Sequence, residues 1–149
     1  HIAEIVFDVR KEKNPCSLCA NLRRCILYDT AVKNGCNKVA LGHHMDDVME
    51  TFFMSLICEG RIHTFAPVTY LSRKKIEIIR PMIYMEEQDV KRFIKKNDIP
   101  IVKNKCPANG ETKRQYMKDL IHKIDKENHR ARESIFGAIT RSGEWEKDK

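Results

Sequence analysis

Residues 38–47 read Lys-Val-Ala-Leu-Gly-His-His-Met-Asp-Asp, and this stretch decides the fold class. Lys38 to Leu41 has the short apolar pattern of a buried strand. Gly42 then opens a turn. The carboxylates of Asp46 and Asp47 suit the first turn of a following helix, because the helix dipole favours negative charge there. A buried strand that turns into a helix is the basic unit of an α/β fold.

The same turn carries the polar groups of a candidate nucleotide site, because ligands bind at the carboxyl ends of strands in open α/β sheets. Gly42 allows close approach to the backbone, and His43 and His44 could donate hydrogen bonds to a phosphate or a leaving group. Adjacent carboxylates could hold Mg²⁺ through oxygen ligands. The alternative is that Asp46 and Asp47 only stabilise a helix N-terminus beside two surface histidines.

On both sides of this turn, segments with helical periodicity alternate with segments of β-prone residues. They predict a partly parallel sheet within a single domain spanning residues 1–149, whose polar tail at 142–149 is expected to fray. The strands are too few for a complete doubly wound sheet, and the chain begins with His1, so we expect further strands upstream. The other expected elements are strands at 2–9, 68–71, 76–79 and 99–102, and helices at 17–34, 46–58, 86–97, 112–127 and 130–141.

The composition bounds the classes of function. Hydrophobic residues make up 42% of the 149 residues, which is enough for a core and argues against wholesale disorder. No apolar run approaches the roughly 18 residues needed to span a bilayer, and no secretory signal is visible, so we expect a cytoplasmic protein without a membrane partner. The formal charge of +7 fits either a nucleic-acid binder or a solvated basic surface.

Six cysteines without a secretory signal point to metal ligands, catalytic thiols or core residues rather than to a disulfide framework. Cys16 and Cys19 form a CxxC pair at the front of a predicted helix, which lets two thiols reach one metal centre. Cys106 in a distant loop could add a third ligand; the alternative is a redox-active or incidental CxxC. The remaining cysteines fall in or beside apolar patterns and are expected to be inert: Cys25, Cys36 and Cys58.

Taken together, the motifs resemble the tRNA 2-thiocytidine synthetases of the PP-loop ATP pyrophosphatase superfamily, over residues 14 to 141. The Gly-His-His-x-Asp-Asp element is shared with tRNA-isoleucine lysidine synthetases, whereas the CxxC and the distant cysteine narrow the likeness to the thiolating branch. The motifs are Cys-Ser-Leu-Cys-x-x-Leu-Arg-Arg at 16–24, Leu-Gly-His-His-x-Asp-Asp at 41–47, Ile-Arg-Pro at 79–81, Asn-Lys-Cys at 104–106, Arg-Gln at 114–115 and Arg-Glu-Ser-Ile-Phe-Gly-Ala at 132–138.

The resemblance implies an enzyme that uses ATP and Mg²⁺ to adenylate the C2 oxygen of a cytidine in tRNA. Sulfur held at a [4Fe-4S] cluster then displaces AMP. It also implies tRNA, through its anticodon arm, and a sulfur donor such as a cysteine desulfurase as partners, and it is compatible with a homodimer. By position, the cluster ligands are Cys16, Cys19 and Cys106; the nucleotide-binding residues are Gly42, His43, Asp46 and Asp47; and the catalytic residues are Asp47 and Arg23.

Basic side chains flank the Cys106 loop and predict a continuous positive surface for the phosphates of tRNA. The alternative is a solvated helix face. The residues concerned are Lys103, Lys105, Lys113, Arg114 and Lys118.

One departure from the family pattern is the phosphate loop Ser-Gly-Gly-x-Asp-Ser, which this sequence lacks. Such a loop cradles pyrophosphate with its backbone N–H groups. We therefore expect the chain to be the C-terminal part of a Rossmann-like PP-loop domain, with a mostly parallel sheet, that is inactive alone. The alternatives are a non-catalytic metal- and nucleic-acid-binding module, or part of another PP-loop ATPase such as a lysidine synthetase.

Overall fold

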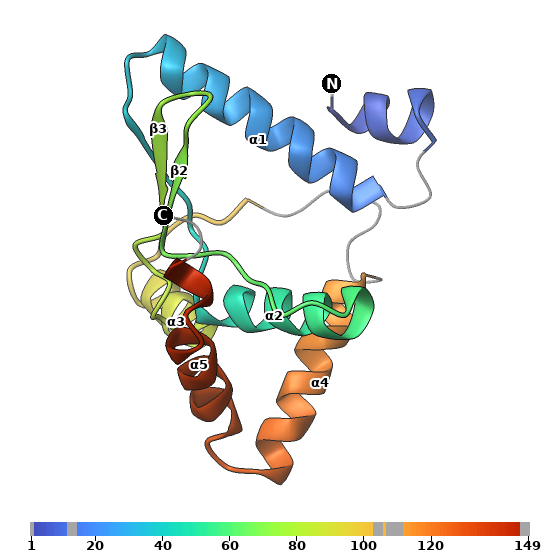
Figure 1. Ribbon diagram of the computed structural model, residues 1–149, viewed down its shortest axis with the longest axis vertical. Coiled ribbons are helices and arrows are strands. Elements are labelled where there is room, and N and C mark those ends of the chain that lie inside the picture. Colours follow the sequence, from blue (N-terminus) through green and yellow to red (C-terminus); the bar gives the residue numbers. More distant parts are fainter. Residues whose placement is uncertain (1, 12–14, 103–105, 107–111, 147–149) are drawn as a thin grey trace. The chain divides into compact units, whose positions relative to one another are not determined.

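The computed structural model describes residues 2–11, 15–102, 106 and 112–146 (Figure 1). By its internal contacts the chain forms two compact units, residues 1–39 with 71–77 and residues 40–70 with 78–149. None of the helices within the described ranges is long and apolar enough to cross a membrane. The elements are η1 (Glu4–Val9), α1 (Pro15–Lys33), β1 (Lys38–Ala40), α2 (Met45–Glu59), β2 (Val68–Leu71), β3 (Ile76–Ile79), α3 (Glu87–Lys96), α4 (Lys113–Glu127), α5 (Ala131–Arg141) and η2 (Glu144–Glu146).

The three described strands form one sheet in the order β1-β3-β2. The backbone N–H of Glu77 donates to the carbonyl of Asn37, and the N–H of Leu41 donates to the carbonyl of Ile79, so β1 and β3 run in the same direction. β2 and β3 form the predicted hairpin and are antiparallel. The α/β class is confirmed, but this sheet is mixed rather than mostly parallel, because one of its two pairings is a hairpin.

The first unit contains η1 and α1. Residues 4–9 form a π-helix, so the strand predicted at 2–9 is wrong. Its apolar residues recur at helical as well as alternating positions, and no strand of the described residues pairs with it, so local hydrogen bonds satisfy its backbone instead. The helix α1 follows the predicted range closely, yet none of its 19 residues is buried.

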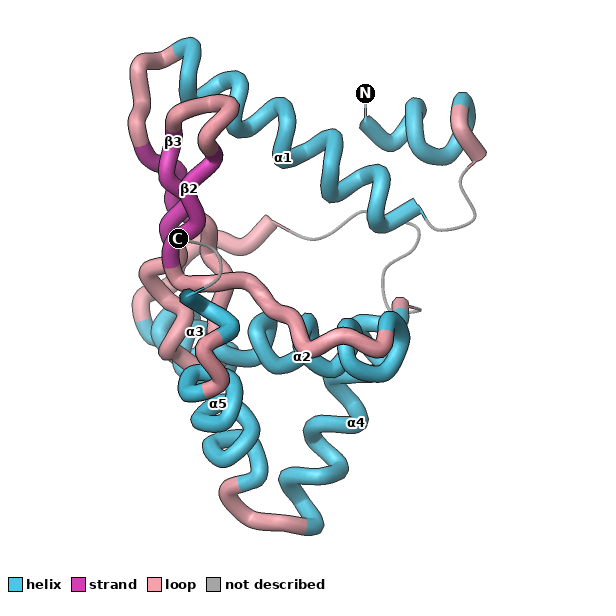
Figure 2. Tube along the Cα trace, viewed as in Figure 1, coloured by secondary structure: helices cyan, strands magenta, loops and turns pink. Residues whose placement is uncertain are grey.

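The second unit is built around α2, which packs against α4 and α5 (Figures 1 and 2). A short turn links these two helices, which contact each other, and Arg130 in it adopts a left-handed backbone with φ 72°. Burial at positions 45, 48 and 49 gives α2 one apolar face. The buried cluster consists of Met45, Val48, Met49, Ile83, Ile121 and Ile139.

Two further expectations differ from the structure. Residues 99–102 form no strand; Pro100 lacks an N–H, and the N–H of Ile99 donates back to Ile94 at the end of α3. The tail is packed rather than frayed as far as it is described, because Glu144–Glu146 form a 3₁₀ turn and Trp145 lies against the core of the second unit.

Candidate functional site

The turn between β1 and α2 is built as the sequence predicts. His44 is the N-cap residue of α2, with extended backbone angles. Its N–H donates to the Asp47 carboxylate at 3.0 Å, which is the second half of a capping box. Gly42 has a negative φ, and an added Cβ would meet only the Met82 side chain, at 3.4 Å. The packing of the chain itself therefore does not require glycine at this position.

Asp46 is turned into the interior and is only 5% exposed. One carboxylate oxygen accepts a hydrogen bond from Arg132 of α5 at 2.5 Å, and the other accepts the Glu87 N–H at the start of α3 at 2.8 Å. Burial opposes ionisation, but the Glu87 N–H and the Arg132 guanidinium outweigh it and hold the pKa of Asp46 below its ordinary value. Asp46 thus ties α2 to α3 and α5.

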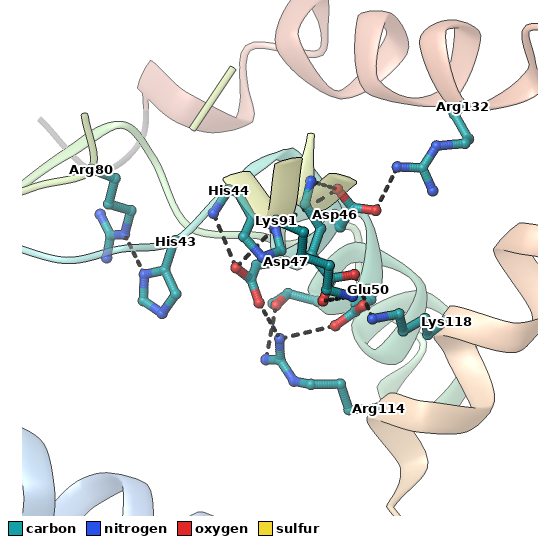
Figure 3. A network of polar contacts seen from close by, with 12 residues as sticks. His43, His44, Asp46, Asp47, Glu50, Arg80, Lys91, Arg114, Lys118 and Arg132 are labelled. Carbon is teal, nitrogen blue, oxygen red and sulfur yellow. Dashed lines mark hydrogen bonds and ion pairs between the residues drawn. The ribbon is translucent and has the colours of Figure 1, made fainter. Parts of the chain in front are cut away.

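Asp47 points in a different direction from the same turn and meets Arg114 from α4 (Figure 3). Arg114 Nη1 lies 3.0 Å from Asp47 Oδ1 and 3.2 Å from Glu50 Oε2. Arg114 Nη2 lies 3.5 Å from the hydroxyl of Thr51. A single guanidinium therefore bridges two carboxylates that are one turn apart on α2.

Glu50 is the buried member of this bridge, with a side-chain exposure of 7%. Burial is the main cause that raises its pKa to about 7, and the negative charge of Asp47 adds to it. The positive charges of Arg114 and Lys118 act in the opposite direction. Glu50 is therefore a carboxyl whose charge changes near neutral pH.

Lys118 continues the network toward α3. Its ammonium lies 2.6 Å from the Glu87 carboxylate, which also pairs with Lys91. Burial opposes ionisation of both partners, but their pairing prevails: it lowers the pKa of Glu87 and raises that of Lys118. The space enclosed by this network, Met49 and Ile121 is too small for a water molecule.

His43 and Arg80 follow the carboxyl ends of the parallel strands β1 and β3. The ring of His43 lies 4.7 Å from that of Phe65, and Arg80 Nε donates to His43 Nδ1 at 3.3 Å. Arg80 also packs over the face of Phe65. Burial lowers the pKa of His43, and the charges of Arg80 and Arg114 add to this lowering against that of Asp47. His43 is therefore a neutral imidazole at neutral pH.

The three cysteines predicted as cluster ligands are divided between the two units. Cys16, exposed, and Cys19, half-buried, are three residues apart at the start of α1 and so share one helix face. Arg23 is exposed one turn further along. Cys106 is exposed in the second unit. Whether Cys106 meets the pair remains a prediction; no group of three or more His, Cys, Asp or Glu positioned for a metal ion occurs among the described residues.

Two expectations about individual side chains need correction. The cysteines expected in apolar surroundings, Cys25, Cys36 and Cys58, are all exposed. Arg114 and Lys118 do not extend a positive surface, because carboxylates of α2 and α3 pair with them. Lys113 is exposed. Lys103 and Lys105 lie outside the described residues.

Sequence reasoning missed roles for Glu50, Arg80 and Arg132. Arg80 and Arg132 stand in the quoted motifs at 79–81 and 132–138, but nothing in a linear pattern shows that they reach His43 and Asp46. Glu50 lies one turn after Asp46 and Asp47. That spacing indicates a shared helix face, and it was the signal from which a role of Glu50 could have been predicted.

Comparison with known proteins identifies the family to which this arrangement belongs. A family model described as a PP-loop domain matches residues 2–124. Relatives named tRNA-cytidine(32) 2-sulfurtransferase from Geobacter metallireducens and Geobacter sulfurreducens are each 36% identical, covering 89% and 88% of this chain and 54% and 53% of their own length. The chain thus spans about half the length of the curated relatives it matches.

A solved structure has a similar fold. The U34-tRNA thiolase NcsA from Methanococcus maripaludis, with its [4Fe-4S] cluster, superposes with a TM-score of 0.72 at 25% identity, covering 88% of this chain and 44% of that one. The family match spans most of the sequence and agrees with the α/β architecture. The chain belongs to the PP-loop domain family.

Proposed function

We propose that this chain forms part of an ATP-dependent tRNA sulfurtransferase that replaces the C2 oxygen of a cytidine with sulfur. The observation that carries the proposal is the presence, on a PP-loop chain, of the accessible thiols Cys16, Cys19 and Cys106. Cys25, Cys36 and Cys58 are exposed as well, so the distinguishing feature of Cys16 and Cys19 is their CxxC spacing at the start of α1, which lets two thiols reach one metal centre. The names of the relatives support sulfur transfer to a cytidine in tRNA, and the name of the structural neighbour supports tRNA thiolation with a [4Fe-4S] cluster.

The nucleotide half of the reaction is assigned to the turn after β1. Gly42 leaves backbone exposed where the fold itself needs no glycine, and neutral His43 can donate one ring N–H to a phosphate. Asp47, with 20% of its side chain exposed, is the carboxylate proposed for Mg²⁺ and ATP. Asp46 belongs to this nucleotide site as the buried anchor that fixes the start of α2, because only 6% of its side chain is exposed and its oxygens face Arg132 and the Glu87 N–H.

The sulfur half of the reaction is assigned to the three cysteines. Thiolates are the usual protein ligands of iron–sulfur clusters, so the donor set Cys16, Cys19 and Cys106 fits a [4Fe-4S] cluster with one iron left open. When bound, the cluster supplies the sulfur that replaces the C2 oxygen after adenylation. Arg23, exposed and four residues after Cys19, is proposed as the basic catalytic residue that stabilises negative charge on the reacting base or the departing AMP.

The partners follow from this assignment. The substrate is the anticodon arm of a tRNA, where a single-stranded loop can present a base to chemistry. A sulfur donor of the cysteine desulfurase type would reload the site, and a cytoplasmic location fits the substrate.

The test uses the protein that carries this chain, purified without oxygen, reconstituted with iron and sulfide, and incubated with ATP, Mg²⁺ and unmodified tRNA. We expect 2-thiocytidine in the digested tRNA by mass spectrometry, and absorbance near 400 nm in the protein. The variants Cys16→Ser, Cys19→Ser and Cys106→Ser should each lose both signals, whereas the matched controls Cys25→Ser and Cys58→Ser should keep them. A colourless protein with stoichiometric zinc and no thiolated tRNA would refute the proposal.

A further inference from the structure

We propose that Arg114 is a positioning residue, which fixes the Asp47 carboxylate for the adenylation step. This inference rests on the proposed function, since it assigns Arg114 a role in that same site. Asp47 carries two oxygens, and both are held: Oδ2 by the His44 N–H at 3.0 Å and Oδ1 by Arg114 Nη1 at 3.0 Å. Removal of the second contact would leave the carboxylate held through Oδ2 alone, with Oδ1 no longer fixed.

Arg114 can hold Asp47 because it is itself anchored. The same Nη1 lies 3.2 Å from Glu50, whose side chain is 7% exposed, and Nη2 lies 3.5 Å from the Thr51 hydroxyl. The Arg114 side chain is 45% exposed, so an isolated ion pair here would be weak. The buried partner distinguishes this bridge from an ordinary surface pair, because it fixes where the guanidinium sits.

The helix that carries Arg114 is also fixed at its start. Thr112 caps α4, and its hydroxyl accepts the Gln115 N–H at 3.2 Å. Arg114 projects from this first turn toward α2, as Figure 3 shows. A chain of contacts therefore runs from the capped α4, through Arg114, to the one oxygen of Asp47 that the turn itself does not hold.

A positive charge at position 114 would not by itself make the contacts with Asp47, Glu50 and Thr51. A guanidinium is planar and offers several N–H donors in a rigid fork, whereas an ammonium is a single point on a flexible stem. Lys at position 114 can pair with Asp47 or with Glu50, but it does not reproduce the bridge to Thr51 as well. The arrangement thus predicts that Arg114→Lys restores only part of what Arg114→Gln loses.

The experiment measures steady-state thiolation by the reconstituted protein that carries this chain, for wild type, Arg114→Gln, Arg114→Lys and the control Lys126→Gln. Lys126 is an exposed cation in the last turn of the same helix. For Arg114→Gln we expect kcat to fall about tenfold to a hundredfold, as misplacement of a catalytic group does. The KM for ATP should change less than about threefold, because Gly42 and His43 are unaltered for nucleotide binding and positioning acts on the chemical step. Arg114→Lys should recover at least about threefold in kcat over Arg114→Gln.

A second pair of variants separates positioning from folding. In Glu50→Gln the anchor is weakened but stays hydrogen-bonded, so kcat should fall less than in Arg114→Gln. The double variant should be no slower than Arg114→Gln alone, since Glu50 acts through Arg114. Unfolding of each variant, followed by circular dichroism, identifies any that fail to fold.

The outcomes are distinct. Folded Arg114→Gln, or Arg114→Ala if the former fails to fold, with kcat within twofold of wild type overturns the positioning role while the proposed function stands. Equal losses in Lys126→Gln also overturn it, because the effect would then follow from net charge. A folded, reconstituted wild type that forms no 2-thiocytidine overturns the proposed function, and the positioning role falls with it.

Discussion

At the scale of single residues, adjacent carboxylates on α2 have different environments. Asp46 is buried against Arg132 and the Glu87 N–H, whereas Asp47 is partly exposed. Loss of one partner from a buried ion pair leaves the other charge uncompensated. We expect Asp46→Ala to lower the free energy of unfolding by roughly 3 kcal/mol, and Asp47→Ala by about 1 kcal/mol, in urea titrations of the chain.

The substitution of Asp47 should also affect activity. Asp47→Ala should abolish thiolation by a protein that remains folded, because the neighbouring Asp46 carboxylate is buried against Arg132 and the Glu87 N–H and does not take its place. Equal destabilisation by the two substitutions would contradict the different burial of the two carboxylates. Near-normal thiolation by Asp47→Ala would reduce this residue to a helix-capping role.

Glu50 predicts a pH dependence of stability. The folded-state pKa is raised from 4.5 to about 7, so the native chain binds a proton that the unfolded chain has released. This contribution is complete below about pH 4.5 and is lost as the pH rises through about 7. Asp46, Asp47, Glu87, Arg114, Lys118 and Arg132 are the charged groups around Glu50 on α2, α3, α4 and α5.

The variant Glu50→Gln isolates this effect. Between pH 5 and 8, the difference in unfolding free energy between Glu50→Gln and wild type should change by about 2–3 kcal/mol in favour of the variant. Chemical denaturation at a series of pH values measures this difference. Parallel curves for the two proteins would show that Glu50 titrates normally in the folded chain.

The sequence predicted part of the candidate site, and the limits are physical. Gly42, His43, Asp46 and Asp47 occupy the expected turn, because strand, glycine and helix cap are consecutive and local. The partners Arg114 and Arg132 come from residues about 70 and 90 positions away, and only tertiary packing pairs them with Asp47 and Asp46. The different orientations of Asp46 and Asp47 follow from the 100° between consecutive helix positions once one face is buried.

At the scale of whole elements, glycines in the sequence affect where a helix ends and how stable it is. Gly60 ends α2 in a left-handed conformation with φ 63°. Gly137 lies inside α5, where an added Cβ would meet only the flexible end of Arg141. We expect Gly60→Ala to destabilise the chain by about 1 kcal/mol and Gly137→Ala to stabilise it by up to about 1 kcal/mol, in thermal or urea unfolding. Effects of the same sign would contradict the assigned backbone conformations.

Elements defined by local signals were predicted well. Helical periodicity, capping residues and the Ser-Arg-Lys-Lys turn predicted the five α-helices of the described ranges and the hairpin to within a few residues. The segments at 2–9 and 99–102 were predicted as strands from β-prone composition alone. A strand exists only if a neighbour pairs with it, and composition does not show whether that neighbour is present.

At the scale of the whole molecule, the two compact units divide the proposed chemistry: Cys16, Cys19 and Arg23 belong to the first, and Asp47 and Cys106 to the second. The proposed binding of tRNA requires cations that reach its phosphates, and the sequence offers Lys103 and Lys105 beside Cys106. In a salt titration of tRNA binding to the complete protein, Lys103→Ala/Lys105→Ala should lower the log–log slope by about 1–2 units. The control Lys126→Ala should leave it unchanged. An unaltered slope in the double variant would show that this loop does not contact phosphate.

The packed segment at 144–146 contains a fluorescent side chain that can report on the second unit. Trp145 is the single tryptophan, and its ring makes edge contacts with Tyr84 and Phe136 in the second unit. Its fluorescence therefore reports only the environment of that unit: emission should shift to longer wavelength when the second unit opens, whatever happens to the first. Compared with a far-ultraviolet signal that also includes α1, the indole emission reveals whether the two units melt together or in sequence.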